Sequence, residues 1–420
     1  MDLTQEEELM LQGAYGPAAK RLISISLKVA EVNGAKGMVD VKSVHNASIH
    51  TFREGPGSWG TVGIELLEEL AREGLKFKIP YTTNGCTVVP ELVGMGLPQE
   101  AQDTQQRAVT ALRKLQAVPI FSCVPFLEWS SPRLGDHLAW AETGTVTFAN
   151  SYYGARTNRE TDLTCLAAAF TGRTPAYGYH LDENRFGDIL VEVDMELDNN
   201  DLGALGFYIA KTETGTAIPV FNGISPHIGY EGVSQLLSAQ GMLAPIAMVH
   251  IVGVTPEAPT LEEAFGGRKP KKTIVVTKKD IEEACQGLST GDKDTKLDLV
   301  LLGCHYATLE KIADVAKALE NKHVHKDVHL WIQTSRSIKN MAEHNGYVEK
   351  IEAAGARVFA DVCCAGVSFK KYSDKLKINS MATDAPKMSY ISQSAPYSGP
   401  LKALYGSTER CIEAAIRGTW

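Results

Sequence analysis

The sequence predicts an α/β fold in which parallel sheets are covered by helices on both faces. Short apolar or β-branched runs recur along the chain, and amphipathic segments lie between several of them. Such an alternation is typical of parallel sheets buried between helices. With 420 residues, 44% of them hydrophobic, the chain is long enough to bury one large core or two fused cores.

The predicted elements begin with a helical stretch over residues 3–32, where Thr4 and Glu7 form a possible capping box. Predicted strands follow at residues 75–83, 117–126, 144–153, 188–197, 245–253, 272–277, 297–304, 327–335 and 356–364. A hydrophilic stretch from Glu257 to Lys272 carries glycine, proline and a basic run, which is typical of a connection. We therefore expect one α/β lobe over residues 1–256 and a second over residues 257–420.

Composition and charge exclude several classes of protein. The net charge of -8 and the pI near 5.8 argue against a general nucleic-acid binder, which concentrates lysine and arginine on one face. The N-terminus lacks the pattern of a secretory signal, and no window is apolar for long enough to cross a membrane. We expect a cytoplasmic protein whose eight cysteines are thiols, metal ligands or core residues.

Three cysteines share one local setting. Cys123, Cys304 and Cys363 each lie at or just after an apolar run that ends in a turn. Ligands of α/β proteins gather at the carboxyl ends of parallel strands, so these thiols are candidate metal ligands. Burial as small core residues is the alternative, since no CxxC spacing supports a metal site. Three further cysteines lie in segments with a helical pattern and are expected to pack in the core: Cys165, Cys285 and Cys411.

Polar side chains concentrate in two neighbouring segments, residues 138–159 and 177–185. Paired arginines supply planar, bidentate donors that suit a carboxylate or a phosphate, so the two segments predict an anion site. A solvated loop with internal ion pairs is the alternative. The candidate residues are Glu142, Ser151, Arg156, Asn158, Arg159, His180 and Arg185.

Further candidates lie at the ends of other predicted strands or beside them. Hydroxyl, amide and imidazole groups there can hold a polar ligand, although hydrogen-bonded structural roles and helix capping are the alternatives. These candidates for substrate binding are Lys42, His45, Thr82, Thr83, Asn84, Thr334 and Ser335.

Several segments, read in order, resemble the large, catalytic subunit of the aconitase X family. They include SCVPF, GDHLAWAE, ANSYYGARTNRE, YGYHLDENR, GVTPEAPTLEEAFGGRKP, LLGCHYATLEKIADVA and GSTERCIEAAIRGTW, and they span nearly the whole chain. The resemblance implies an aconitase-like catalytic core without the swivelling domain. It also implies an iron-dependent hydro-lyase that dehydrates cis-3-hydroxy-L-proline or mevalonate 5-phosphate.

The resemblance further assigns roles to residues. Cys123, Cys304 and Cys363 correspond to the ligands of an iron-sulfur cluster, [4Fe-4S] or [3Fe-4S], or of a smaller iron centre. Three thiolates on a cubane leave one iron open to act as a Lewis acid. Elimination also needs an anchor for the carboxylate, and Arg156 and Arg159 are our candidates for it. Asn158, His180 and Arg185 are expected to shape the pocket, and Ser151 is a further candidate catalytic residue. A small swivelling-domain subunit is implied as the partner that supplies the catalytic base.

This sequence departs from the family pattern at two cysteines. The third cysteine segment reads DVCC where Asp-Thr-Cys is usual, and the second reads GCHY where Gly-Cys-Pro-His is usual. Cys364 or Cys86 is therefore an alternative ligand. A non-catalytic iron-sulfur scaffold or a redox-sensing subunit is the alternative function.

Overall fold

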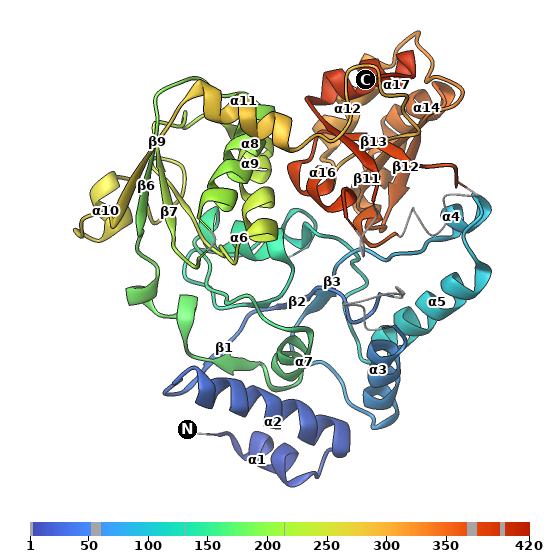
Figure 1. Cartoon of the computed structure of the whole chain (residues 1–420). Helices are drawn as coiled ribbons and strands as arrows, with labels where there is room; N and C mark the ends of the chain where they lie inside the picture. The colour runs from blue at the N-terminus through green and yellow to red at the C-terminus, as the bar shows by residue number, and fades with distance from the viewer. Residues whose placement is uncertain (1–2, 52–59, 130, 214, 368–375, 395–399) are drawn as a thin grey trace.

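The computed structural model describes residues 3–51, 60–129, 131–213, 215–367, 376–394 and 400–420. The predicted α/β class is confirmed, because helices alternate with strands and three of the four sheets formed by the described strands are parallel. The fourth is an antiparallel pair of β1 (Met38–Asp40) and β5 (Arg173–Pro175). In Figure 1 the first third of the chain lies at the bottom, the middle third at the upper left and the last third at the upper right.

The first third is built on a three-stranded parallel sheet of order β3-β2-β4. The predicted N-terminal helix is confirmed as two helices, separated where Gly13 and Gly16 both adopt a φ of 94°. The predicted capping box of Thr4 and Glu7 is also confirmed. The elements are α1 (Gln5–Gln12), α2 (Pro17–Val32), β2 (Val44–Asn46), α3 (Val62–Arg72), β3 (Tyr81–Thr83), α4 (Pro90–Gly94), α5 (Gln99–Lys114), β4 (Ala139–Trp140) and α7 (Asp162–Thr171).

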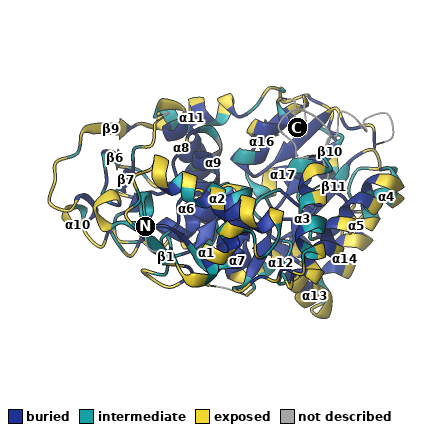
Figure 2. Cartoon of the chain, turned by 90° about the horizontal axis from the view of Figure 1, so that it is seen from below, coloured by how far each residue is buried: buried dark blue, intermediate teal, exposed yellow. Residues whose placement is uncertain are grey.

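The middle third contains a four-stranded parallel sheet of order β8-β7-β6-β9. Its strands are β6 (Ile189–Val193), β7 (Pro219–Asn222), β8 (His250–Ile251) and β9 (Lys272–Val276), and its helices are α8 (Asn199–Thr212), α9 (Gly229–Leu243), α10 (Leu261–Phe265) and α11 (Lys278–Gly287). Figure 2 shows α8 and α9 largely buried and the edge strand β9 largely exposed. The predicted boundary between residues 256 and 257 falls between β8 and β9. Since β9 pairs with β6, this boundary lies between strands of one sheet.

The last third contains a five-stranded parallel sheet of order β12-β11-β10-β13-β14. One face packs against α12, α13, α14 and α17, and the other against α16 and apolar residues of α4 and α5. The elements are β10 (Leu299–Leu302), α12 (Leu309–Ala318), β11 (His329–Thr334), α13 (Arg336–His344), α14 (Tyr347–Ala353), β12 (Arg357–Ala360), β13 (Ser380–Thr383), α16 (Pro386–Ser392), β14 (Lys402–Tyr405) and α17 (Thr408–Arg417).

Two predicted strands are wrong. Residues 144–153 lie mostly in α6 (Thr143–Ser151), which begins after the N-cap residue Glu142. Every residue from Gly144 to Ser151 is buried. Because no face of the helix is exposed to water, apolar and β-branched residues occur on every face and the sequence shows no amphipathic pattern. Residues 117–126 form only an isolated bridge at Phe121 and then the short helix η1 (Pro125–Leu127), because proline cannot donate a ladder hydrogen bond.

Candidate active site

Two parallel sheets meet at their carboxyl edges. Asn84 and Glu142 follow strands β3 and β4 of the first sheet, while Cys304 and Cys363 follow β10 and β12 of the last sheet. The edges are joined directly, since Cys86 forms a parallel bridge with Val362 and the backbone N–H of Cys363 donates to the Cys86 carbonyl at 2.7 Å. The carboxyl edge of a parallel sheet is where α/β proteins bind ligands.

The three predicted cysteines lie together at this junction. Burial raises the pKa of the Cys123 thiol well above its usual value, and the charges of Glu142, Cys304 and Cys363 add to the rise. Burial likewise raises the pKa of Cys304 to about 12, and the charge of Cys363 adds to it. The three thiols are therefore within electrostatic range of one another and hold their protons at neutral pH unless a metal displaces them.

An ion pair between Glu142 and Lys387 is buried beside these thiols. The Lys387 ammonium lies 2.7 Å from Oε1 of Glu142, and the two side chains are only 12% and 5% exposed. Burial, the largest single effect, would raise the pKa of Glu142, but the charges of Lys387 and His305 and the hydrogen bonds from Lys387 and Thr145 together outweigh it and lower that pKa below its usual range. Burial is outweighed in the same way at Lys387, whose pKa is raised by Glu142. Both groups are consequently charged.

Glu142 also connects the ion pair to the first cysteine. Its Oε2 accepts the backbone N–H of Thr145 at 2.7 Å, which caps helix α6. The Thr145 hydroxyl lies 2.7 Å from the same carboxylate oxygen and 2.9 Å from the carbonyl oxygen of Cys123. The loop of Cys123 is thus fixed to the N-terminus of α6.

His305 lies against the same helix. A Cβ atom on Gly144 would come within 1.9 Å of its Nε2, so the imidazole packs directly on the backbone of α6. Nδ1 lies 3.2 Å from the hydroxyl of Ser234, whereas the buried Nε2 has no hydrogen-bond partner within the part of the chain that the structure describes. Burial lowers the pKa of His305 to about 4, so the ring is neutral. Neither His305 nor Lys387 was among the residues predicted from sequence.

Of the predicted residues of the first sheet, Asn84 follows β3 at the same carboxyl edge, whereas His45, Thr82 and Thr83 lie within β2 and β3. His45 shares a 2.9 Å hydrogen bond with the Thr82 hydroxyl, and burial lowers its pKa to about 3. Thr83 is bonded to His50 at 2.6 Å, and Asn84 accepts the backbone N–H of Gly85 at 2.9 Å. Lys42 precedes strand β2 and is exposed.

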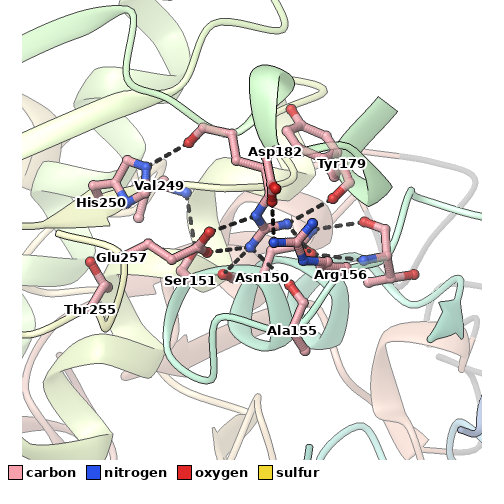
Figure 3. Close-up of polar contacts among 12 residues, drawn as sticks. Asn150, Ser151, Ala155, Arg156, Tyr179, Asp182, Val249, His250, Thr255 and Glu257 are labelled. Carbon is pink, nitrogen blue, oxygen red and sulfur yellow. Dashed lines mark hydrogen bonds and ion pairs between the residues drawn. The ribbon is translucent and has the colours of Figure 1, made fainter. Parts of the chain in front are cut away.

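Most predicted residues of the second polar region are engaged in internal contacts. Arg185, only 3% exposed, pairs with Glu257 and donates to the carbonyl oxygens of Tyr179, Asn150 and Ala155 at 3.0, 3.2 and 2.9 Å. Figure 3 shows Glu257, Asn150, Tyr179 and Ala155 gathered in this network. Arg156 forms an ion pair with Asp182 and donates to the His180 carbonyl at 3.2 Å.

Other predicted polar residues hold loops and helix ends. The Ser151 hydroxyl accepts the N–H of Val249 at 2.9 Å, and Asn158 donates to the Tyr177 carbonyl at 3.0 Å. His180 lies 2.9 Å from His137, Nδ1 to Nδ1. Thr334 donates to the Ala307 carbonyl at 2.7 Å, and Ser335 is the N-cap of α13.

Arg159 is placed differently. Its side chain is exposed and donates to the hydroxyl of Thr143, the first residue of α6. It therefore reaches the residue next to Glu142, at the edge of the thiol junction.

The structure is an α/β fold in which two parallel sheets meet at their carboxyl edges, and this junction is the candidate active site. Models of the first, second and third domains of aconitase X match residues 1–183, 187–286 and 297–417. A phosphomevalonate dehydratase large subunit from Methanothermobacter thermautotrophicus is 35% identical over 86% of this chain and 87% of its own length. A cis-3-hydroxy-L-proline dehydratase from Pseudomonas aeruginosa is 30% identical over 98% of this chain and 69% of its length.

A solved structure agrees with these matches. The crystal structure of Thermococcus kodakaraensis aconitase X in its holo form superposes with a TM-score of 0.86 at 30% identity, covering 99% of this chain and all of that chain. The chain belongs to the aconitase X family, and with relatives named dehydratases it is a hydro-lyase. The resemblance drawn from the sequence is confirmed. Among the described residues, no helix is both long enough and apolar enough to cross a membrane.

The internal contacts of Arg185 indicate that this residue stabilises the fold. Arg185→Met is expected to lower the free energy of unfolding by roughly 3–5 kcal/mol, because it leaves a partly buried carboxylate and several carbonyls without their donor. Urea unfolding followed by circular dichroism measures the change. Arg107→Met is the matched control, since its bidentate pair with Glu68 is exposed and is expected to contribute less than about 1 kcal/mol. Equal stability of both variants would contradict the structural role of Arg185.

Proposed function

We propose that this chain removes water from a small hydroxy acid at the junction of Cys123, Cys304 and Cys363, with an iron-sulfur centre as the Lewis acid. The observation that carries the proposal is the convergence of three thiols, buried at Cys123 and partly buried at Cys304 and Cys363, on a largely buried, charged Glu142–Lys387 pair. Burying this many ionisable groups together costs folding free energy, which a functional site explains. All eight cysteines are free thiols, which fits the reducing cytoplasm that we propose as its location.

The donor set fits a centre with several irons. Cysteine thiolates are the usual protein ligands of iron-sulfur clusters, and three of them leave one iron of a cubane without a protein ligand. Cys123, Cys304 and Cys363 would hold the cluster, and an iron without a protein ligand would carry the charge of the departing hydroxide.

Cys363 is favoured over its two rivals as the third ligand. The charges of both Glu142 and Lys387 act on Cys363, as they do on Cys304. Cys364 is fully buried in the apolar core between the last sheet and α4, and its backbone N–H donates to Gln333. Cys86 lies in the same core.

This assignment predicts iron content. Chains purified without oxygen are expected to lose most of their iron in Cys123→Ala, Cys304→Ala and Cys363→Ala, because each removes a thiolate ligand. A colorimetric iron assay per folded chain measures the loss. Cys364→Ala and Cys165→Ala are matched controls that remove fully buried thiols and should retain iron. If Cys364→Ala loses iron and Cys363→Ala keeps it, the third ligand is Cys364.

We propose that Arg159 is the main residue that binds the substrate carboxylate and that Arg156 is the second. Arg159 is exposed and contacts the first residue of α6, whereas Arg156 is paired with Asp182. A guanidinium binds a carboxylate through two parallel hydrogen bonds, which orients the substrate as well as holding it. The loops that carry the two arginines would be supported by Asn158, Ser151 and His180. The site would also be lined at strand β3, by Thr82, Thr83 and Asn84.

Arg159→Met is therefore expected to raise KM about tenfold or more, the loss typical of a charge-assisted hydrogen bond, while the iron content stays at the wild-type level. Steady-state kinetics on the iron-loaded enzyme measures the effect. Arg156→Met is the comparison, with a smaller expected rise. An unchanged KM in Arg159→Met would reject the anchor.

The base that removes the substrate proton is proposed to come from a small swivelling-domain subunit. Lys387 stays protonated beside Glu142, Glu142 is ionised and engaged by Lys387 and Thr145, and His305 is a weak base. None of the three is suited to abstract a proton from carbon. The name "large subunit" of the archaeal relatives implies a small subunit, and about a third of the Pseudomonas relative lies beyond the match.

The substrate that we propose first is mevalonate 5-phosphate, because relatives named for that activity match this chain over nearly all of their length. cis-3-Hydroxy-L-proline is the second candidate, supported by the Pseudomonas relative. Both contain a carboxylate beside the carbon that loses its proton, which the same arginine anchor can bind.

A two-substrate assay tests both the substrate and the partner. The chain co-purified with the candidate small subunit is expected to dehydrate one of the two acids, and the chain alone to be at least about a hundredfold slower because a general base contributes that much. Product formation by mass spectrometry measures the rate. Full activity of the isolated chain would reject the missing base, and iron binding without any dehydration would favour a scaffold or redox-sensing subunit.

A further inference from the structure

The charge of Lys387 is placed where it acts on the thiols that would hold the iron centre. The ammonium lies 2.7 Å from Glu142, and the Thr145 hydroxyl lies 2.7 Å from the same carboxylate and 2.9 Å from the Cys123 carbonyl oxygen. In this position the charge of Lys387 acts on both Cys304 and Cys363, while the Glu142 carboxylate acts on all three cysteines with the opposite sign. The Lys387 side chain is 12% exposed, so water screens its charge weakly. The iron centre of the proposed function would therefore share a buried site with one cation and one anion of known position.

Both charges are held by the start of a helix. Glu142 is the N-cap of α6, and its second oxygen is engaged by Thr145. Lys387 is the second residue of α16, where Pro386 packs close to the backbone of α8 at Gly203, at 3.1 Å from a Cβ built there. Met388, on the other side of Lys387, is fully buried. The pair is thus a fixed feature of the fold rather than a contact between mobile surface side chains.

We propose that Lys387 and Glu142 act as positioning residues that set the reduction potential of the iron centre in opposite directions. A reduced centre carries one more negative charge than an oxidised one, so a fixed cation favours reduction and a fixed anion opposes it. Net charge and surroundings are the terms that tune iron-sulfur potentials over a wide range. In an enzyme that uses iron as a Lewis acid, this balance keeps the centre in one oxidation state.

Two simpler roles for Lys387 agree less well with the structure. A general base needs an unprotonated amine, yet Glu142 raises the pKa of Lys387 against the effect of burial. A substrate anchor needs access to the ligand, yet Lys387 is largely buried and already paired at 2.7 Å. An electrostatic role toward the thiols requires neither deprotonation nor exposure.

The experiment measures the midpoint potential of the iron-loaded wild type and its variants by anaerobic redox titration, followed by optical and electron paramagnetic resonance spectra. Lys387→Met is expected to shift the potential to more negative values, and Glu142→Gln to more positive values. Lys387→Arg keeps the charge and is expected to stay near wild type. Glutamine can still accept the Thr145 N–H, so Glu142→Gln removes the charge and retains the helix cap.

Arg173→Met is the matched control for loss of a partly buried ion pair. Arg173 is 17% exposed and pairs at 2.6 Å with the buried Glu7, and its contacts lie at α1, at the opposite end of the view in Figure 1 from α16. Its loss should reduce thermal stability but leave the potential unchanged. A shift in this control equal to that of Lys387→Met would show that destabilisation alone moves the potential, and would overturn the inference.

The inference rests on the proposed iron centre, and the two fail in different ways. A wild-type chain that binds no iron overturns the proposed function and this inference with it. A wild-type chain with iron, but with unshifted potentials in both variants or shifts of the same sign, overturns the inference alone. If Lys387→Met loses its iron, the Glu142→Gln potential decides: a positive shift supports the inference, and an unchanged or negative one rejects it.

Discussion

The ion pair between Glu142 and Lys387 joins the first third of the chain to the last sheet at the point where the thiols meet. Two charges so deeply buried lose much of their hydration, and only their close approach and the surrounding hydrogen bonds offset that cost. The positions of the Glu142 carboxylate and the Lys387 ammonium must therefore be well defined. Helix α6 positions the carboxylate, α16 positions the ammonium, and the loop of Cys123 is tied to the same N-cap through Thr145.

The sequence predicted the class of fold because parallel strands buried on both faces read as apolar runs, as at β6, β10 and β11. The same property caused the error at α6, a helix buried on every side that shows no amphipathic period. Strands β7, β13 and β14 were not predicted, since each spans only four residues and contains proline, polar or charged residues: Pro219 and Asn222 in β7, Ser380 and Thr383 in β13, and Lys402 in β14. Local pattern cannot distinguish burial of a strand from burial of a helix.

The site was predictable only in part, for a comparable reason. The rule that ligands gather at carboxyl ends of strands placed Cys304 and Cys363 correctly after β10 and β12, whereas Cys123 follows no strand. At the polar loops around Arg156 and Arg185 the sequence leaves two uses open, because a loop that must satisfy its own buried carbonyls needs the same side chains as one that binds an anion. Lys387 gave no signal, since a single lysine in the first turn of a short helix has no distinguishing neighbours.

The position of the charges also bears on why the dehydration that we propose would draw its base from a second chain. The junction already holds three thiols, one carboxylate and one ammonium in a small buried volume, and each charge fixes the protonation of the others. A base in the same cluster would be driven either to bind a proton permanently beside the anions or to lose its basicity through burial, as the low pKa of His305 illustrates. A base brought from outside this electrostatic cluster, on a separate subunit that closes over the substrate, escapes that conflict and can keep a pKa suited to proton abstraction.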